Sequence, residues 1–581
     1  MPIGDRIISD LLVGSGAATV IVLTWAVYAG LLLLLGRAAS RVLPGRRRLG
    51  GLAAFWVGLA LFLGYIQVWH LILPARTWAW GSVAVIAAGQ AWSDRASLRP
   101  LARGARTSSL LSRSYASLIL LASFWLAHLS VQEPFFYDAG LYHLQAIQWA
   151  GEFRVVPGLA NLHTRFGFNT AWWPFVSSLG FGPWRGHEAH LSTGLVIAPL
   201  LAEQGRCLLD LVQRRTFRPE HVVGAVLLPV TFSQVSFGWV SSPGYDQPLY
   251  AMVVVTTIYA LRSVGEPWLA PVAVLVAAGA VLVRLQAAPF SAAVCVIILV
   301  ATFRARTTRP AQLRGVVVSL VIGAFGSVVY VGRGIVTSGY PFFPFDTGAI
   351  SVDWRVPRDD AREAHLSIVD FSRAAVRGQE GWSWIPHWWD SNNDLSTLRF
   401  GLIVTVFSIA VALVALAIHG HQELSVLSRS RLGWIWVAAL VGVAAWFVAA
   451  PNPRLGMGVI WACAALTLAA AIAVLPGVRS KIVIFTPVFL LLSAQAAWAL
   501  LGSGQVWPAV PRGSGPFGAV EPPRPTSVSV LGPARYTVPT SGDQCWNLPI
   551  PCAEALHPRL RQRSDRLSDG FAALPVKSGQ G

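Results

Sequence analysis

Hydrophobic positions along the chain form long uninterrupted runs that are separated by short polar connectors. A helix needs about 20 apolar residues to cross a bilayer, and the first run, Leu11–Leu35, is long enough. Counting each run of roughly 15 to 25 apolar residues as one crossing gives about fourteen spans, the last being Ile482–Leu501. Trp78–Trp92 and Trp268–Val283 are the shortest of them. The pattern predicts an all-α polytopic membrane protein, with Leu11–Leu35 as a retained helix rather than a cleaved signal peptide.

Arginines gather in alternate connectors, which orients the predicted spans. The clusters fall at 37–48, 95–113, 214–218, 304–314 and 429–431. Cytoplasmic loops carry an excess of Lys and Arg, so these connectors are expected inside and the others, with both termini, outside. This distribution also accounts for the net charge of +18, so nucleic-acid binding has no support. The preference for Arg over Lys hints at a GC-rich bacterial genome, and we expect a multi-pass protein of the bacterial cytoplasmic membrane.

Composition agrees with a membrane protein. Charged residues make up 12% of the chain, against roughly 25% in a soluble domain. Three of the five cysteines lie in or beside apolar runs, where packing explains them. Cys545 and Cys552 lie close together in the polar tail, where a disulfide is favoured over free thiols if the tail is outside the cytoplasm. No Cys/His spacing resembles a zinc site.

The polar stretch Glu133–Trp173 is the most informative connector. Aromatic residues alternate in it with ionisable ones, including Asp138, His143, His163 and Arg165. An acid among aromatic residues at a membrane surface can have a raised pKa and act as a general base, and Asp138 fits this description. Asp138 is also a suitable cap for a helix over Ala139–Ala150, and the two roles are compatible. His143 is equally consistent with a substrate contact and with interfacial packing.

Other candidate residues lie at the ends of later spans. Asp246, in SSPGYDQP, is either a helix cap or a second acid at the depth of Asp138. Arg284 lies between two apolar runs, where an anionic phosphate is a natural partner. Arg333 and Arg454 are weaker phosphate candidates, for which contact with lipid phosphate by snorkelling is favoured.

A tryptophan-rich segment, WSWIPHWWD at 382–390, has two interpretations. It is either an aromatic belt at the membrane interface or a platform on which a sugar or lipid stacks. Trp388 belongs to this segment.

At these residues the chain resembles the GT-C superfamily of multi-pass glycosyltransferases, and more closely an uncharacterised bacterial GT-C-like family. The resemblance covers about Tyr115 to Cys552, and loop one is its specific part. It is carried by these segments: YDAGLYHLQAIQW, VPGLANLHTRFGFN, SSPGYDQP, SGYPFFP, PNPR and GDQCWNLPIPC.

The resemblance implies a domain organisation of about 11 core spans preceded by about three additional ones. The parts are an N-terminal transmembrane addition (1–113), a GT-C-like core (114–335) with a catalytic extracytoplasmic loop (132–187), an extracytoplasmic insert (336–398), C-terminal transmembrane helices (399–501) and a small extracytoplasmic tail (502–581).

The resemblance also implies roles for single residues. Asp138, with His143 and Asp246, would be catalytic, and Arg284, Arg333 and Arg454 would bind the donor phosphate. Substrate-binding residues would be Tyr137, Tyr142, His163, Arg165, Asn169 and Trp388. Many GT-C enzymes have paired acids in loop one, whereas Tyr137 and Ala139 flank Asp138 here. We therefore assign no metal ligand and leave the use of a divalent cation open.

The function expected from these features is transfer of a sugar from a polyprenyl-phosphate donor to an extracytoplasmic glycan, lipid or protein acceptor during cell-envelope polysaccharide biosynthesis. One alternative is a transporter or flippase for lipid-linked glycans. It would need ionisable residues deep within spans, whereas the polar residues here are expected at the outer ends. Another alternative is a non-catalytic assembly partner, which would tolerate neutralisation of Asp138 and Asp246.

Overall fold

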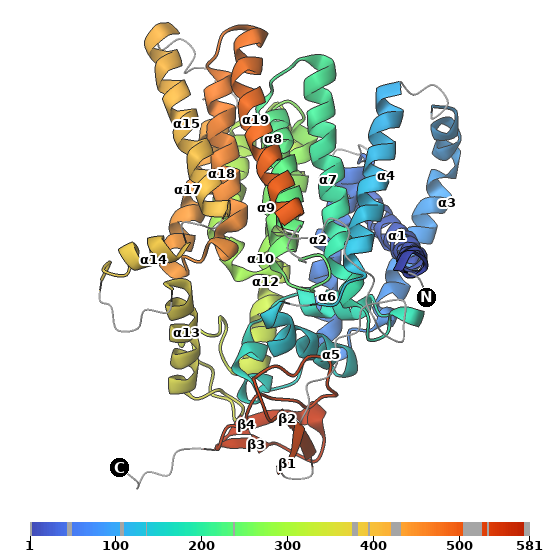
Figure 1. The fold of residues 1–581 in the computed structure, drawn as a ribbon. Coiled ribbons are helices and arrows are strands. Elements are labelled where there is room, and N and C mark those ends of the chain that lie inside the picture. The colour runs from blue at the N-terminus through green and yellow to red at the C-terminus, as the bar shows by residue number, and fades with distance from the viewer. Residues whose placement is uncertain are drawn as a thin grey trace.

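The computed structural model describes most of the chain, and its helices stand side by side in one bundle (Figure 1). The described residues are 3–42, 49–104, 110–134, 136–235, 239–374, 381–392, 396–419, 431–502, 526–531 and 534–574. Parts of three expected arginine clusters, at 43–48, 105–109 and 429–430, lie outside these ranges.

Helices coincide with every predicted span, because a backbone in hydrocarbon must satisfy its own hydrogen bonds. The long helices are α1 (Ile3–Val42), α2 (Gly51–Ile72), α3 (Trp80–Gly104), α4 (Leu110–Ser130), α7 (Ala189–Arg214), α8 (Pro219–Val235), α9 (Asp246–Arg262), α10 (Ala270–Val283), α11 (Ala288–Arg304), α12 (Pro310–Ser338), α15 (Ser396–His419), α17 (Leu432–Ala449), α18 (Pro453–Ala473) and α19 (Gly477–Gly502). Shorter helices are α5 (Leu144–Glu152), α6 (Trp172–Ser178), α13 (Arg358–Ser372) and α14 (Ile385–Asn392).

Among the described residues, eight helices are long and apolar enough to cross a membrane. A shorter apolar helical stretch covers Pro267–Val283. The prediction of an all-α polytopic membrane protein is therefore confirmed, while the count of about fourteen spans stays a prediction.

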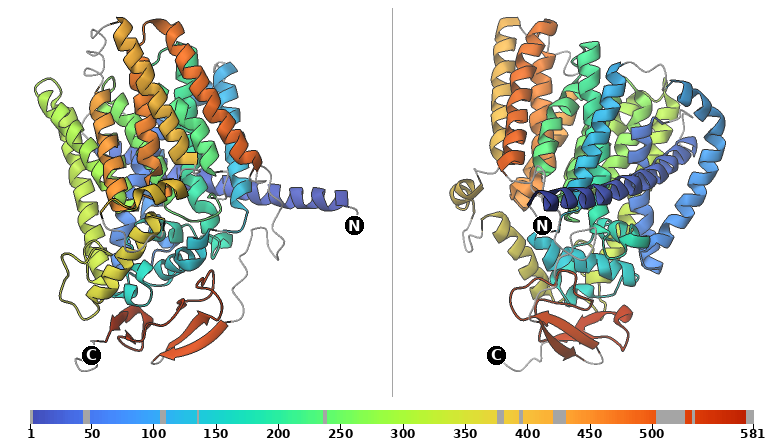
Figure 2. Two further views of the ribbon diagram at one scale, coloured as in Figure 1. Left: turned by 60° about the vertical axis from the view of Figure 1, so that its left-hand side comes forward. Right: turned by 45° about the vertical axis from the view of Figure 1, so that its right-hand side comes forward.

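The first helix differs from its neighbours in direction. Figure 2 shows α1 strongly inclined across the upright helices. Two glycines allow its close approach to α2, since small residues let helix backbones meet. A Cβ on Gly36 would lie 2.7 Å from the carbonyl carbon of Ala54, and one on Gly58 would lie 2.6 Å from that of Leu32. Side chains larger than hydrogen at these two positions would push the helices apart.

The two ends of the bundle carry different structures. The connectors α7–α8 and α18–α19 lie at one end, while α5, α6, α13 and the strands lie toward the other, here called the loop end (Figure 1). The strands form two antiparallel pairs, β1 (Thr526–Leu531) with β2 (Ala534–Pro539) and β3 (Leu560–Gln562) with β4 (Phe571–Ala573).

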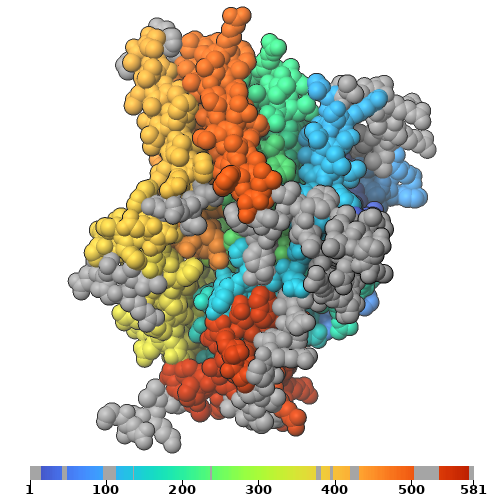
Figure 3. Space-filling view, in the orientation of Figure 1, coloured from blue at the N-terminus to red at the C-terminus, as the bar shows by residue number. Residues whose placement is uncertain are grey.

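The C-terminal tail is fastened to the insert at the loop end. Arg559 Nη2 donates to Asp360 Oδ1 at 2.8 Å, and Arg563 Nε donates to Asp353 Oδ2 at 2.8 Å. Figure 3 shows the tail, in red, covering this end of the molecule beneath the insert, in yellow. The tail is thus part of the folded protein and not a detached appendage.

Candidate functional site

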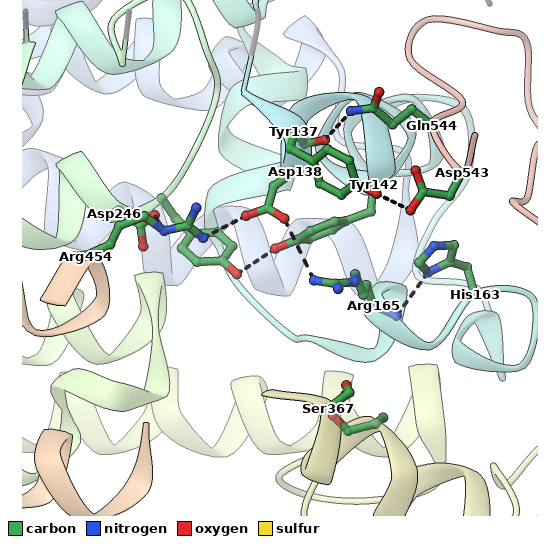
Figure 4. A network of polar contacts seen from close by, with 12 residues as sticks. Tyr137, Asp138, Tyr142, His163, Arg165, Asp246, Ser367, Arg454, Asp543 and Gln544 are labelled. Carbon is green, nitrogen blue, oxygen red and sulfur yellow. Dashed lines mark hydrogen bonds and ion pairs between the residues drawn. The ribbon is translucent and has the colours of Figure 1, made fainter. Parts of the chain in front are cut away.

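Asp138 stands where loop one turns into a helix, and its carboxylate points away from that helix. The turn after it, η2 (Ala139–His143), is a π-helical turn that continues into α5. The Asp138 side chain accepts no capping hydrogen bond from the helix backbone, so the capping interpretation is wrong. Its carboxylate instead accepts a hydrogen bond of 2.7 Å from Arg454 Nη2, as Figure 4 shows.

Arg454 joins the two acids that the sequence singled out. It lies in the first turn of α18, where the side chain of the N-cap residue Asn452 accepts a hydrogen bond from its backbone N–H at 3.0 Å. Its Nε lies 3.2 Å from Asp246 Oδ2, so one guanidinium is paired with both Asp138 and Asp246. One of the two weaker phosphate candidates is therefore the residue at the centre of the cluster.

Asp246 begins α9 and is held by a second arginine. Arg284 follows the last residue of α10 in extended backbone, and its Nη1 donates to Asp246 Oδ1 at 2.5 Å. The Arg284 guanidinium also lies 4.6 Å from the ring centre of Tyr245, a cation–π contact. The cap position of α9 is occupied by Tyr245, and Asp246 is the first residue of the helix, with both carboxylate oxygens paired with arginine.

A third arginine reaches Asp138 from loop one itself. Arg165 Nη1 lies 3.8 Å from Asp138 Oδ1, which is an ion pair beyond hydrogen-bonding distance. The backbone N–H of Arg165 donates to His163 Nδ1 at 3.1 Å, so His163 orients Arg165. Burial lowers the pKa of His163 to about 4, and this imidazole is neutral at neutral pH.

The cluster of Asp138, Asp246, Arg165, Arg284 and Arg454, here called the arginine–aspartate cluster, carries one more positive than negative charge. Its acids are shielded, with side-chain exposures of 14% for Asp138 and 6% for Asp246, whereas Arg165 is 38% exposed. Partly exposed guanidinium groups with an excess positive charge can bind phosphate oxygens.

The electrostatics of Asp138 differ from the prediction. Burial by itself would raise the pKa of this carboxyl, but the positive charge of Arg454, with its hydrogen bond, and that of Arg165 outweigh burial. The pKa is held below its ordinary value, and the expectation of a raised pKa is wrong. Asp138 is ionised at neutral pH.

Aromatic side chains pack beside the arginine–aspartate cluster. The hydroxyls of Tyr142 and Tyr245 are 2.9 Å apart, and burial raises the pKa of Tyr142 well above its ordinary range. His143 packs against Trp173, with ring centres 4.6 Å apart, and neither of its ring nitrogens has a hydrogen-bond partner in the described structure. Burial lowers the pKa of His143 to about 3, so the imidazole is neutral there.

The tail braces the segment on both sides of Asp138. Tyr137 donates its hydroxyl to Asp543, and Gln544 Nε2 donates to the Tyr137 carbonyl at 2.9 Å (Figure 4). The backbone N–H of Trp546 donates to the Gly140 carbonyl at 2.8 Å.

Trp546 lies in a tail loop that is closed by a disulfide between Cys545 and Cys552, and Asp543 and Gln544 directly precede this loop. Gln145 Nε2, one turn into the helix, donates to the carbonyls of Trp546 and Leu548 at 3.1 and 2.6 Å. The disulfide loop, residues 545–552, thereby fixes the start of the helix that carries Asp138.

Three predicted site residues lie elsewhere. Arg333 is buried against α2 and α6, where it donates to the Thr170 carbonyl at 2.9 Å and contacts His70 and Gln67. Asn169 donates to the Tyr330 carbonyl at 2.5 Å and so ties loop one to α12. Trp388 is buried and donates its indole N–H to the Pro451 carbonyl at 2.7 Å. This hydrogen bond holds the short loop that precedes α18 and Arg454.

Sequence reasoning missed Tyr245 and the tail contacts. Tyr245 is adjacent to Asp246, so the motif itself carried that signal. Asp543 and Trp546 lie in a tail segment that the sequence singled out. The residues of loop one that they contact are about 400 positions earlier in the chain, and no local sequence pattern predicts a contact over such a separation.

Among the cavities of the described structure, one has a volume of about 750 Å³ and another of about 460 Å³, and Asp138 and Asp246 line neither of these two. The smaller one contains Glu203, which is buried in α7 and paired with Arg262 of α9. This buried ion pair is an exception to the expectation that the polar residues gather at the outer ends of the spans. No group of three or more His, Cys, Asp or Glu that could hold a metal ion occurs among the described residues.

Comparison with known proteins identifies a family. The model of a family described as "Domain of unknown function (DUF8201)" matches residues 19–461. The chain belongs to this family, since the match covers well over half of its length. No curated protein and no solved structure matches the chain.

Proposed function

We propose that this member of the DUF8201 family is a GT-C-type glycosyltransferase that moves a sugar from a polyprenyl-phosphate donor to an extracytoplasmic glycan, lipid or protein acceptor. The observation that carries the proposal is the arginine–aspartate cluster at the loop end of an apolar bundle. It combines a carboxylate that can accept a proton with an excess of arginine that can bind a phosphate. A lipid-linked substrate needs both groups close to a membrane.

In the proposed reaction Asp138 is the base. The acceptor oxygen attacks C1 of the sugar, the bond between C1 and the phosphate oxygen breaks, and its electron pair leaves with polyprenyl phosphate. The acceptor proton passes to Asp138 Oδ1, the oxygen that lies 3.8 Å from Arg165 and outside its hydrogen-bonding distance. Attack opposite the leaving group inverts the configuration at C1.

The arginines have two effects in this reaction, which act at different moments. In the free site they lower the pKa of Asp138 and make it a poor base. A phosphate that binds Arg165 and Arg284 competes for the same positive charge, which raises the basicity of Asp138. Donor binding thus prepares the base, and the arginines then stabilise the charge that develops on the departing phosphate.

The test is turnover of a panel of radiolabelled polyprenyl-phosphate sugars by the full chain in lipid nanodiscs. Asp138→Asn is expected to retain donor binding and to lose transfer by at least about a hundredfold, the low end of the contribution of a general base. Asp359→Asn, the same change at an exposed position of α13, is the matched control and should transfer at the wild-type rate. Wild-type turnover by Asp138→Asn would refute the role of Asp138.

A second candidate function, transport or flipping of a lipid-linked glycan, is favoured by the buried pair of Glu203 and Arg262. Ionisable residues inside helices commonly mark substrate or ion pathways. This function predicts that fluorescent lipid-linked glycan crosses the bilayer of proteoliposomes and that Glu203→Gln slows the crossing. If donors bind but are neither transferred nor moved, a non-catalytic assembly partner is the remaining alternative.

A further inference from the structure

The larger cavity, of about 750 Å³, lies beside the helix that follows Asp138. Its size is within the range of about 300 to 1,000 Å³ typical of small-molecule sites. Leu144 and Gln148 of α5 form one wall, the connector before α7 with Glu188 forms another, and Asn547 of the disulfide loop closes a third side. Leu144 is six residues after Asp138, or about 9 Å along a helix.

The charged residues of this cavity balance one another. Arg76 donates to the Gly151 carbonyl at 2.6 Å and pairs with Glu152, and Arg185 Nη2 lies 3.9 Å from Glu152 Oε1. Both arginines are thus already opposed by a carboxylate, and Glu188 adds a second acid. Two positive and two acidic groups leave no excess charge, so the cavity is not suited to an anionic phosphate, in contrast to the arginine–aspartate cluster.

The other lining groups both donate and accept hydrogen bonds. The amides of Gln148 and Asn547 offer N–H and C=O groups to the cavity. Glu188 Oε1 accepts from the Gly186 backbone N–H at 2.9 Å, and burial raises the pKa of this carboxyl above its ordinary value.

Two aromatic side chains also line the cavity and are open to solvent or lipid. Trp78 is 82% exposed and Phe181 is 67% exposed. Small-molecule pockets are commonly lined by aromatic side chains together with a few polar groups. A ligand for this cavity must therefore be uncharged, rich in groups that donate and accept hydrogen bonds, and have apolar faces that stack on rings.

We infer that this cavity is a binding site for an uncharged oligosaccharide. Sugar hydroxyls both donate and accept hydrogen bonds, and the C–H faces of sugar rings stack on aromatic side chains. The position beside the Asp138 helix is suited to holding a glycan chain next to the arginine–aspartate cluster. The inference concerns binding alone and does not require the transfer reaction.

The experiment measures binding of end-labelled neutral oligosaccharides of four to six hexoses to the full chain in nanodiscs, by equilibrium dialysis. Anionic oligosaccharides and inorganic phosphate are measured in parallel, and nanodiscs with and without phosphatidylglycerol separate a lipid headgroup from a free ligand. Gln148→Ala and Trp78→Ala each remove one expected contact. Trp498→Ala is the matched control, because Trp498 is 79% exposed on α19 and does not line the cavity.

We expect a neutral oligosaccharide to bind and the two cavity variants to weaken it by about tenfold each, the effect of losing roughly 1.4 kcal/mol of contact. Trp498→Ala and Asp138→Asn should bind it as the wild type does. The last variant separates this inference from the transfer proposal, since binding should survive when transfer is lost. Binding of no neutral oligosaccharide, a preference for phosphate or lipid headgroups, or equal binding by all variants would overturn the inference.

Discussion

Reduction of the Cys545–Cys552 disulfide is expected to loosen the helix that carries Asp138. The disulfide loop contributes the Trp546 N–H that binds the Gly140 carbonyl, and the two carbonyls that bind Gln145. These contacts lie immediately after Asp138 in the chain. Without them the start of the helix is held mainly by Arg454 and by its own packing.

The size of the effect follows from the length of the closed loop. The two cysteines are separated by 7 residues in sequence. In the chain-entropy model, a disulfide that closes a loop of this length lowers the conformational entropy of the undocked tail and so raises its free energy by about 2.4 kcal/mol at 25 °C. Reduction returns that freedom to the undocked state, so the equilibrium constant for docking should fall by roughly 60-fold.

Hydrogen exchange measures this change directly, because local opening exposes backbone amides. Residues 139–152 should exchange faster after reduction, and a Cys545→Ser/Cys552→Ser variant should behave in the same way without reductant. Peptides from α18 are the internal control and should not change. Exchange of 139–152 that stays the same in the reduced protein and in the variant would refute the bracing role of the disulfide loop.

Three further outcomes are expected at the same site. Gly140→Ala should undock the tail and accelerate exchange of the preceding loop, because its Cβ would lie 2.6 Å from Cδ2 of the Trp546 ring. Gly89→Ala, with open space around it, should have neither effect. Arg454→Gln should lower the free energy of unfolding by about 3 kcal/mol, measured by denaturation in detergent, because it leaves two shielded carboxylates without their shared partner. The stabilisation that ionised Asp138 gives should be fully present above the pKa of about 3.9 that this carboxyl has in the unfolded chain. It should be lost as the pH falls through the lower pKa of the folded state. Protection of this loop from hydrogen exchange should therefore hold from neutral pH to about pH 4 and decline only below that.

The helices could be predicted because they depend on local pattern. Each apolar run predicts a helix with internal hydrogen bonds, and each of the predicted spans overlaps a helix. The interruption at Arg284 was also visible, because a guanidinium between two apolar runs ends one helix before the next begins.

The candidate site was predicted in part. The sequence identified Asp138, Asp246, Arg284 and Arg454 as single residues, and the structure brings these four together. The sequence could not rank Arg454 above Arg333 as a site residue, because both are arginines near the end of an apolar run. Which of them meets a carboxylate depends on how α12 and α18 are placed relative to loop one.

The order of residues along the chain was sufficient to predict the class of the protein, the positions of its helices and the residue types available for chemistry. Which of these residues become partners depends on the complete fold. Arg454 contacts Asp138 although the two are 316 positions apart in the sequence, and the disulfide loop contacts Gln145 at a separation of about 400. The sign of the pKa change at Asp138 follows from those contacts, because nearby arginines oppose the effect of burial. Electrostatic interactions depend on distance in space, and a sequence specifies that distance only through the complete fold.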